Sequence, residues 1–259
     1  MLISIHTHLV YSAESPCDLL LQIEAAESAS QRCESMSFTM PSDAGTHHVS
    51  GEENVGQRLW TRVSEVFDCT YEAQVRVERP AVALQGLEQV PFRAIPDDVT
   101  KFLMPSRYCH PEEFLEFVPQ QFGQLQGGRL IAAMSSWINE NFTYDNGISH
   151  GATNATESFH ARAGVCRDYA HVLITMARSV GIPARIVSAY APDVSPQDFH
   201  AVAEVFLEGA WHMVDATGMS EAPETVQIGV GRDAADISFM TSYGWMSLKK
   251  QSVRVERAT

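Results

Sequence analysis

The chain has 259 residues, of which 45% are hydrophobic and 19% are charged, and its formal net charge is −14 at pH 7. A chain of this length can bury a core in one large or two small domains, and its acidity disfavours a nucleic-acid partner or an anionic membrane surface. No stretch approaches the roughly 18 apolar residues of a membrane helix, and the first residues do not read as a secretory signal, so we expect a cytoplasmic protein with no membrane partner. The five cysteines are scattered without a CxxC pair, which is typical of free thiols.

The first hundred or so residues alternate apolar and polar side chains over short runs, as antiparallel strands do. Strands are predicted over 2–11, 18–26, 33–40, 57–66 and 69–77, with turn signals at 41–45 and 52–54. Strands of this length and spacing predict a sandwich or an open barrel. His6 and His8 share one face of the first strand, but no third ligand accompanies them, and we interpret them as part of a solvated face.

Helical spacing replaces this alternation after a linker rich in proline, predicted over 90–107. A short helix is predicted over 111–121 and a longer amphipathic helix over 128–142. Asn154, with Glu157 three residues later, resembles a capping box for another short helix that ends at Arg162.

The stretch 163–171 brings a cysteine into the first turn of a further predicted helix. Apolar residues recur there at three- and four-residue spacing, and Gly181 with Pro183 ends the helix. The polar stripe of this helix consists of Arg167, His171, Thr175 and Arg178. Cys166 therefore meets the free N–H groups and the positive end of the helix dipole, and both favour a thiolate.

Two strand patterns follow the helix. Residues 199–206 begin near His200, residues 211–215 end at Asp215, and 208–210 form a tight hairpin between them. His200 and Asp215 are symmetric about this turn to within a residue, so we expect their side chains to form a hydrogen bond. If the cysteine helix packs on this hairpin, Cys166, His200 and Asp215 converge as nucleophile, base and orienting group.

The last part of the chain is less regular. Residues 226–239 are interrupted by glycine and predict no single element, although 236–239 are expected to return toward the cleft. Residues 245–255 predict a final strand, because Val253 and Val255 alternate with charged neighbours.

These motifs resemble the transglutaminase-like superfamily, and in particular its bacterial cysteine-protease branch. The resemblance covers about 137–218 and rests on Gly164-Val165-Cys166-Arg167-Asp168-Tyr169-Ala170-His171, Gly181-Ile182-Pro183-Ala184-Arg185, His200-Ala201 and Asp215-Ala216-Thr217. Two positions depart from the family pattern, since Val202 replaces the usual Trp and Ala216 the usual Pro. Both are candidates for reshaping the substrate cleft, and neither removes a residue of the triad.

The resemblance implies an α+β fold. A papain-like transglutaminase core, in which the helix that bears the cysteine packs on an antiparallel sheet, is expected after an N-terminal antiparallel β domain. The expected bounds are 1–106 for the N-terminal domain and 107–240 for the catalytic core. A C-terminal strand within 241–259 is suggested to return to the N-terminal domain.

The predicted function is thiol-dependent acyl transfer on the amide bonds of a protein or peptide. Catalysis is assigned to Cys166, His200 and Asp215, with the Cys166 backbone N–H as one oxyanion donor and a second donor that the sequence does not identify. Water as the acceptor gives a peptidase or amidase, which we favour, and an amine gives a transglutaminase. No cofactor is predicted, and no acidic loop of the calcium-binding type is present.

Other interpretations of the same residues stay open. The three triad residues could instead hold zinc with an open position, and the two departures leave room for a non-catalytic interaction protein with a disarmed cleft. Asp168 is expected to cap the helix or to pair with Arg185, and His171 to pack beneath the site. The remaining histidines near the site, His160 and His212, are poor candidates for the base.

Overall fold

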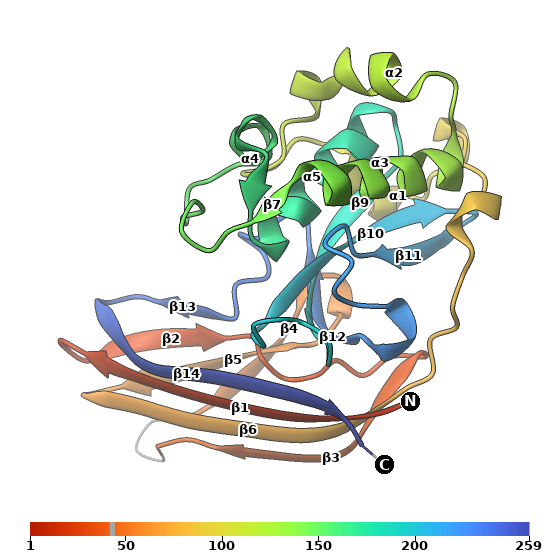
Figure 1. The fold of residues 1–259 in the computed structure, drawn as a ribbon. Coiled ribbons are helices and arrows are strands. Elements are labelled where there is room, and N and C mark those ends of the chain that lie inside the picture. The colour runs from red at the N-terminus through yellow and green to blue at the C-terminus, as the bar shows by residue number, and fades with distance from the viewer. Residues whose placement is uncertain (42–44, 259) are drawn as a thin grey trace.

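The computed structural model describes residues 1–41 and 45–258 (Figure 1). Residues 42–44 of the turn signal at 41–45 lie outside the described residues. The described strands form three four-stranded antiparallel sheets and one parallel pair. Among the described helices, none is both long and apolar enough to cross a membrane.

Two of the sheets lie in the lower part of Figure 1 and share one apolar core. The first has the order β14-β1-β6-β3, with bounds Met246–Arg257, Leu2–Ala13, Val66–Val77 and Gln31–Thr39. The second has the order β13-β2-β5-β4, with bounds Met240–Ser242, Cys17–Leu21, Gln57–Val63 and His47–Ser50. Alternate side chains of β1 and β6 enter the core between the sheets, for example Phe67, Cys69 and Tyr71 of β6.

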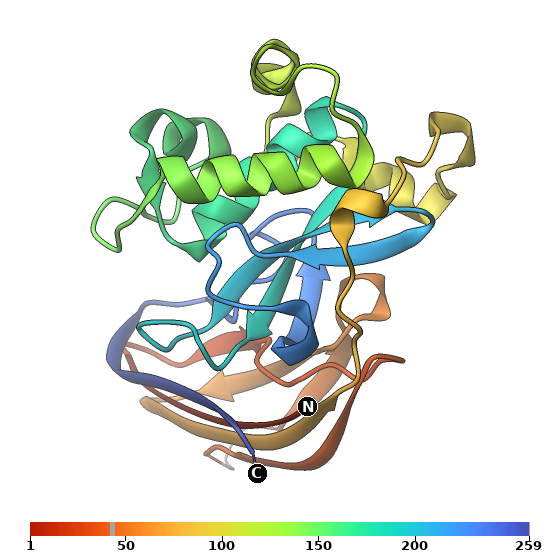
Figure 2. The same cartoon turned by 45° about the vertical axis from the view of Figure 1, so that its right-hand side comes forward.

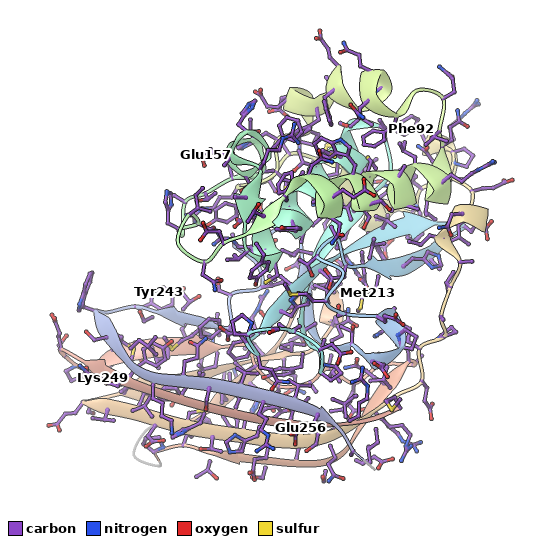
Figure 3. The ribbon with its side chains drawn as sticks, viewed as in Figure 1. Phe92, Glu157, Met213, Tyr243, Lys249 and Glu256 are labelled. Atoms are coloured by element: carbon purple, nitrogen blue, oxygen red, sulfur yellow. The ribbon has the colours of Figure 1, made fainter. Side chains whose placement is uncertain are left out.

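The start and the end of the chain meet in the first of these sheets. β14 pairs antiparallel with β1, and the N–H of Ala258 donates to the carbonyl of Leu2 at 2.9 Å. The two termini therefore lie close together (Figures 1 and 2). Lys249 and Glu256 mark the course of β14 along the lower sheet (Figure 3).

The third sheet lies above this pair and carries a layer of helices (Figure 2). Its order is β11-β10-β9-β12, with bounds Ala210–Val214, His200–Leu207, Ala184–Tyr190 and Val226–Gly231. The helix α5 (Cys166–Ser179) packs on β9 and β10, and α3 (Gly127–Asn141) and α4 (Ala155–Ala161) pack on α5. The predicted α+β architecture, with the cysteine helix on an antiparallel sheet after a β-rich N-terminal region, is confirmed.

The upper and lower parts are joined by apolar side chains of the third sheet. Tyr190 of β9 and Val226 and Ile228 of β12 are buried in the core of the lower sheets. The Tyr190 hydroxyl also donates to the carbonyl of Ile23 at 2.7 Å. The ends of β9 and β12 are therefore held against the lower sheets.

Several predicted boundaries are wrong. β2 ends at Leu21 and does not continue to residue 26, and the predicted linker contains short helices at Phe92–Ala94, Asp97–Thr100 (α1) and Lys101–Leu103. The helix predicted over 111–121 is two pieces, Pro111–Phe114 and α2 (Phe117–Phe122). Pro119 has no N–H to give to a preceding turn, so it fits the first turn of a new helix better than the middle of a long one. Three further single turns lie at Glu52–Asn54, Leu84–Gly86 and Ala222–Glu224.

Candidate active site

Cys166 is the first residue of α5, as predicted. The chain reaches it through β8 (Ala163–Gly164), which pairs in parallel with β7 (Thr143–Tyr144). Asp168 caps the helix, since its Oδ2 accepts the N–H of Val165 at 2.9 Å. A Cβ on Gly164 would lie 2.6 Å from that oxygen, so only glycine leaves room for the cap. The thiol is therefore held at the N-terminus of a helix, where the dipole favours its anion.

The predicted hydrogen bond between His200 and Asp215 is present. His200 Nε2 lies 2.7 Å from Asp215 Oδ2, and both side chains are almost completely buried. The two residues come from neighbouring strands, because His200 is the first residue of β10 and Asp215 directly follows β11.

The turn that joins these strands sets their register. Glu208 and Gly209 both have positive φ angles, 50° and 81°, as a two-residue hairpin turn of the primed type requires. Because Ala203 pairs with Val214, Asp215 falls opposite residue 202 and reaches His200 on the diagonal. His200 and Asp215 are thus two residues away from exact symmetry about the turn, and not one as predicted. Their side chains nevertheless lie on the same face of the sheet.

Asp215 is surrounded by hydrogen-bond donors. Its Oδ1 accepts the N–H and the hydroxyl of Thr217 at 2.8 and 2.7 Å, and its Oδ2 also accepts the hydroxyl of Ser220 at 2.8 Å. Burial raises the pKa of Asp215, but these bonds and the His200 imidazole outweigh burial and hold the pKa below its ordinary value. Sequence reasoning missed the roles of Thr217 and Ser220. An Asp followed two residues later by Thr is a signal for a local Asx turn, whereas no local signal points to Ser220.

The pKa of His200 is shifted far from its ordinary value. Burial lowers the pKa of His200, but hydrogen bonding and charge from Asp215 and from the Cys166 thiol raise it to about 10. Because Asp215 holds Nε2, the other ring nitrogen, Nδ1, is the one left for the thiol. Nδ1 is buried and has no hydrogen-bond partner in the described part of the chain. This arrangement favours an imidazolium beside a thiolate.

A cavity of about 520 Å³ opens above Cys166 and His200. The aromatic rings of Phe199 and Phe239 stack in its wall, with centroids 4.6 Å apart. Residues 237–239 line it, so the predicted return of 236–239 toward the cleft is confirmed. Met240 of β13 and Gln251 of β14 also line it, so the lower sheets contribute to the wall of the cavity.

The two departures from the family pattern lie away from this cavity. Val202 is buried and packs with Val187 and Val230 inside the third sheet. Ala216 is buried in the core beneath the helices. Neither is among the described residues that line the cavity. The geometry therefore does not support the expectation that these two residues reshape the substrate cleft.

The predicted pairing of Asp168 with Arg185 is wrong. Asp168 pairs with its neighbour Arg167 at 3.1 Å while it caps the helix, and Arg185 forms a buried pair with Glu204 at 2.7 Å. Arg185 and Glu204 are cross-strand partners on β9 and β10, and that proximity decides the pairing.

Most of the polar stripe of α5 is buried, since His171, Thr175 and Arg178 are buried and Arg167 is half-buried. His171 does pack beneath the site, where it stacks on Tyr108 and its Nε2 accepts the N–H of Ala234 at 3.1 Å. His160 is exposed on α4, and His212 contacts the carbonyl of Leu207 at 3.2 Å, so neither approaches the thiol.

The N-terminal histidines face carboxylates on the neighbouring strand. His6 lies 3.8 Å from Glu72, and His8 lies 2.9 Å from Asp68. Within residues 1–41 and 45–258, no group of three or more His, Cys, Asp or Glu side chains is arranged to hold a metal ion.

A cysteine at a helix start, packed on an antiparallel sheet with a hydrogen-bonded His–Asp pair, is the arrangement of the papain-like class of folds. Residues 120–216 match the transglutaminase-like superfamily. The crystal structure of a "putative cysteine protease" from Cytophaga hutchinsonii is similar over 99% of this chain and 90% of that chain, with a TM-score of 0.93 and 30% sequence identity. This chain belongs to the transglutaminase-like superfamily.

Curated relatives also occur in mycobacteria. An uncharacterised protein of Mycobacterium leprae is 24% identical over 169 residues, which are 61% of this chain and 60% of that protein. An uncharacterised protein of Mycobacterium tuberculosis is 32% identical over 123 residues, which are 42% of this chain and 39% of that protein. The chain therefore matches less than two thirds of the length of these relatives.

Proposed function

We propose that this protein is a thiol-dependent enzyme that hydrolyses amide bonds in proteins or peptides through Cys166, His200 and Asp215. The observation that carries the proposal is the His200 imidazole between the Asp215 carboxylate and the Cys166 thiol at the floor of a cavity. Membership of the superfamily and the likeness to the Cytophaga hutchinsonii protein support a cysteine-based enzyme.

In the first half of the reaction the Cys166 thiolate attacks the carbonyl carbon of the amide. The electron pair of the C=O bond moves onto the oxygen, and the backbone N–H of Cys166 donates to this oxyanion. The tetrahedral intermediate then collapses and the C–N bond breaks. His200 gives its proton to the leaving amine, and the acyl group remains on Cys166 as a thioester.

In the second half a water molecule attacks the thioester carbonyl while His200 accepts its proton. The C–S bond breaks, the carboxylic acid leaves, and the ion pair of Cys166 and His200 is restored. Asp215 accepts from Nε2 throughout, which keeps the other ring nitrogen toward the reacting atoms and stabilises the imidazolium.

Transfer to an amine is the second candidate, and one residue favours it. Asp198 lines the same cavity, and its Oδ1 is fixed by the amide of Gln251 and the N–H of Phe199, both at 2.8 Å. An amine-bearing acceptor that enters the cavity would meet this carboxylate. The thioester would then pass to nitrogen instead of water.

A panel of peptide amides, incubated with the full chain in the presence and absence of a primary alkylamine, separates these candidates by mass spectrometry. Release of free acid supports hydrolysis, and an amide to the added amine supports transfer. Cys166→Ala should abolish both products. His212→Ala is the matched control, because His212 lies on the same hairpin but contacts only a backbone carbonyl, and it should retain activity.

A thiol-directed probe tests whether the protein is a cysteine-based enzyme. Cys166 should react faster than Cys33, which is the most exposed of the other described cysteines. Equal reactivity of the two cysteines, together with no product from any amide, would contradict catalysis and support a binding protein with a disarmed cleft.

A further inference from the structure

The short parallel pair β7–β8 ties a tyrosine to the segment that leads into the cysteine helix. Tyr144 pairs with Gly164, two residues before Cys166. The N–H groups on either side of Tyr144, from Thr143 and Asp145, donate to carbonyls of the 162–164 segment at 2.9 and 3.0 Å. The backbone of Tyr144 is therefore held at a fixed place relative to the start of α5.

The side chain of Tyr144 faces the reactive thiol. It lines the same cavity as Cys166 and His200, and its ring contacts that of Tyr169 on α5, with centroids 6.0 Å apart. Tyr144 and Cys166 line that cavity together, and the backbone and the thiol of Cys166 both influence the pKa of the Tyr144 phenol. Burial and the negative charge of the thiolate raise the pKa of Tyr144, so the phenol keeps its proton and remains a donor.

We propose that Tyr144 is the second oxyanion donor of the site, and this role rests on the acyl-transfer function proposed above. The Tyr144 hydroxyl and the Cys166 N–H place two donors beside one sulfur. When the thiolate bonds to a carbonyl carbon, the C=O electron pair moves onto oxygen, and that oxygen accepts from both donors. The phenol proton stays on Tyr144 throughout, so no further base or acid is needed.

Two other strong donors that line the cavity are already engaged. The Arg167 guanidinium donates to Asp168 and to the hydroxyl of Ser149, the latter at 2.7 Å. The side-chain amide of Gln251 donates to Asp198. Tyr144 differs from these two donors because Cys166 itself influences the pKa of its phenol, and we assign to it the charge that develops next to the thiol.

Two reagents distinguish an oxyanion donor from a group that only activates the thiol. p-Nitrophenyl acetate acetylates a thiolate through a tetrahedral oxyanion and expels p-nitrophenolate. Iodoacetamide alkylates the same thiolate by displacing iodide, and no oxyanion forms. The rate of each modification at Cys166 is measured by peptide mapping of the full chain, so no natural substrate is required.

Tyr144→Phe keeps the ring and removes the hydroxyl. We expect acetylation of Cys166 to slow by about 10- to 100-fold, whereas alkylation stays within about threefold of the wild type. Tyr169→Phe is the matched control, since it removes a neighbouring hydroxyl that does not line the cavity, and it should change neither rate. An unchanged acetylation rate in Tyr144→Phe, or an equal loss of both reactions, would overturn the assignment.

A second variant tests the donor role of Tyr144 if Tyr144→Phe folds poorly. Incorporation of 3,5-difluorotyrosine at position 144 keeps the shape of the side chain but lets the phenol ionise at lower pH. Acetylation of Cys166 should then fall off at a lower pH than in the wild type, while alkylation should not, because a phenolate cannot donate. Identical pH profiles for acetylation would contradict the role. If wild-type Cys166 reacts with neither reagent, the acyl-transfer function itself fails, and the role of Tyr144 fails with it.

Discussion

His200 has a different partner on each side of its ring, and this asymmetry determines the chemistry of the site. Asp215, which accepts hydrogen bonds from two hydroxyls, holds one ring nitrogen. The other ring nitrogen is on the side of the Cys166 thiol. The residue types and their spacing were enough to predict that Cys166 opens a helix and that His200 and Asp215 form a hydrogen bond. They were not enough to predict Tyr144 or Ser220, because these side chains reach the site through contacts that no local pattern encodes.

The charge of His200 should persist well into the alkaline range. Its pKa is raised to about 10, so the stability that its charged form contributes is complete below the ordinary value of about 6.5 and is lost as the pH rises through about 10. Asp215→Asn removes one of the groups that raise this pKa, and the titration should move to lower pH. NMR of a labelled His200 ring measures both midpoints, and an unchanged midpoint in Asp215→Asn would contradict the interpretation.

The cysteine helix shows what a periodic pattern can and cannot predict. The start of α5 at Cys166 and its apolar face agree with the spacing of the side chains. The spacing separated a polar stripe from the apolar face, and three residues of that stripe, His171, Thr175 and Arg178, are buried. Periodicity separates polar from apolar faces, but it cannot tell a solvated face from one that distant loops cover.

Arg178 explains why this stripe is buried. Its guanidinium donates to the carbonyls of Ala184, Met104 and Arg232 and to the hydroxyl of Ser106. Three segments that are far apart in the sequence are thereby tied to the last turn of α5, where a cation also complements the helix dipole.

Replacement of this arginine should be costly. Arg178→Met leaves several buried acceptors without a donor, and we expect the free energy of unfolding to fall by about 3 kcal/mol or more. Urea unfolding measures the loss. Arg129→Met is the matched control, because Arg129 is exposed on α3, and it should stay within about 0.5 kcal/mol of the wild type. Equal effects of the two substitutions would show that the Arg178 network does not stabilise the fold.

The described part of the chain has two large apolar cores and a small one inside the third sheet, and residues from both its upper and lower parts line the cavity above Cys166. The alternation of the first hundred residues predicted strands there, and it predicted most of them near their actual positions. The order β14-β1-β6-β3 was beyond such reasoning, because strand order depends on pairings between segments that are distant in sequence.

Burial of His171 against Tyr108 and Ala234 should make the protein sensitive to acid. Burial lowers the pKa of His171 to about 4, opposed by Asp233 and Asp168 and reinforced by Arg167 and Arg178. In the unfolded chain the imidazole is protonated below about pH 6.5, whereas in the folded chain it stays neutral down to about pH 4. The free energy of unfolding is therefore not reduced by this group above about pH 6.5, and it falls by about 3 kcal/mol as the pH decreases to about 4.

A variant without this titration tests the prediction. His171→Gln should be less stable than the wild type near neutral pH, but it should lose less stability between about pH 6.5 and about pH 4.5. Urea unfolding at several pH values gives both slopes. His160→Gln, a change on the exposed surface of α4, should keep the wild-type slope, and a wild-type slope in His171→Gln would assign the acid sensitivity to other groups.

The pairing of β1 with β14 also has a consequence for biosynthesis. The two strands meet across almost the whole chain, as the bond from Tyr11 to Gln251, 240 residues apart, illustrates. On the ribosome β1 is translated before β14, so the edge of β1 that pairs with β14 lacks this partner until β14 has been translated. Met240 and Gln251 arrive in that same late stretch, so a nascent chain that already carries Cys166, His200 and Asp215 still lacks one wall of its cavity. The thiol is therefore translated before two of the residues that line its cavity, and the cavity is complete only after β14 has left the exit tunnel.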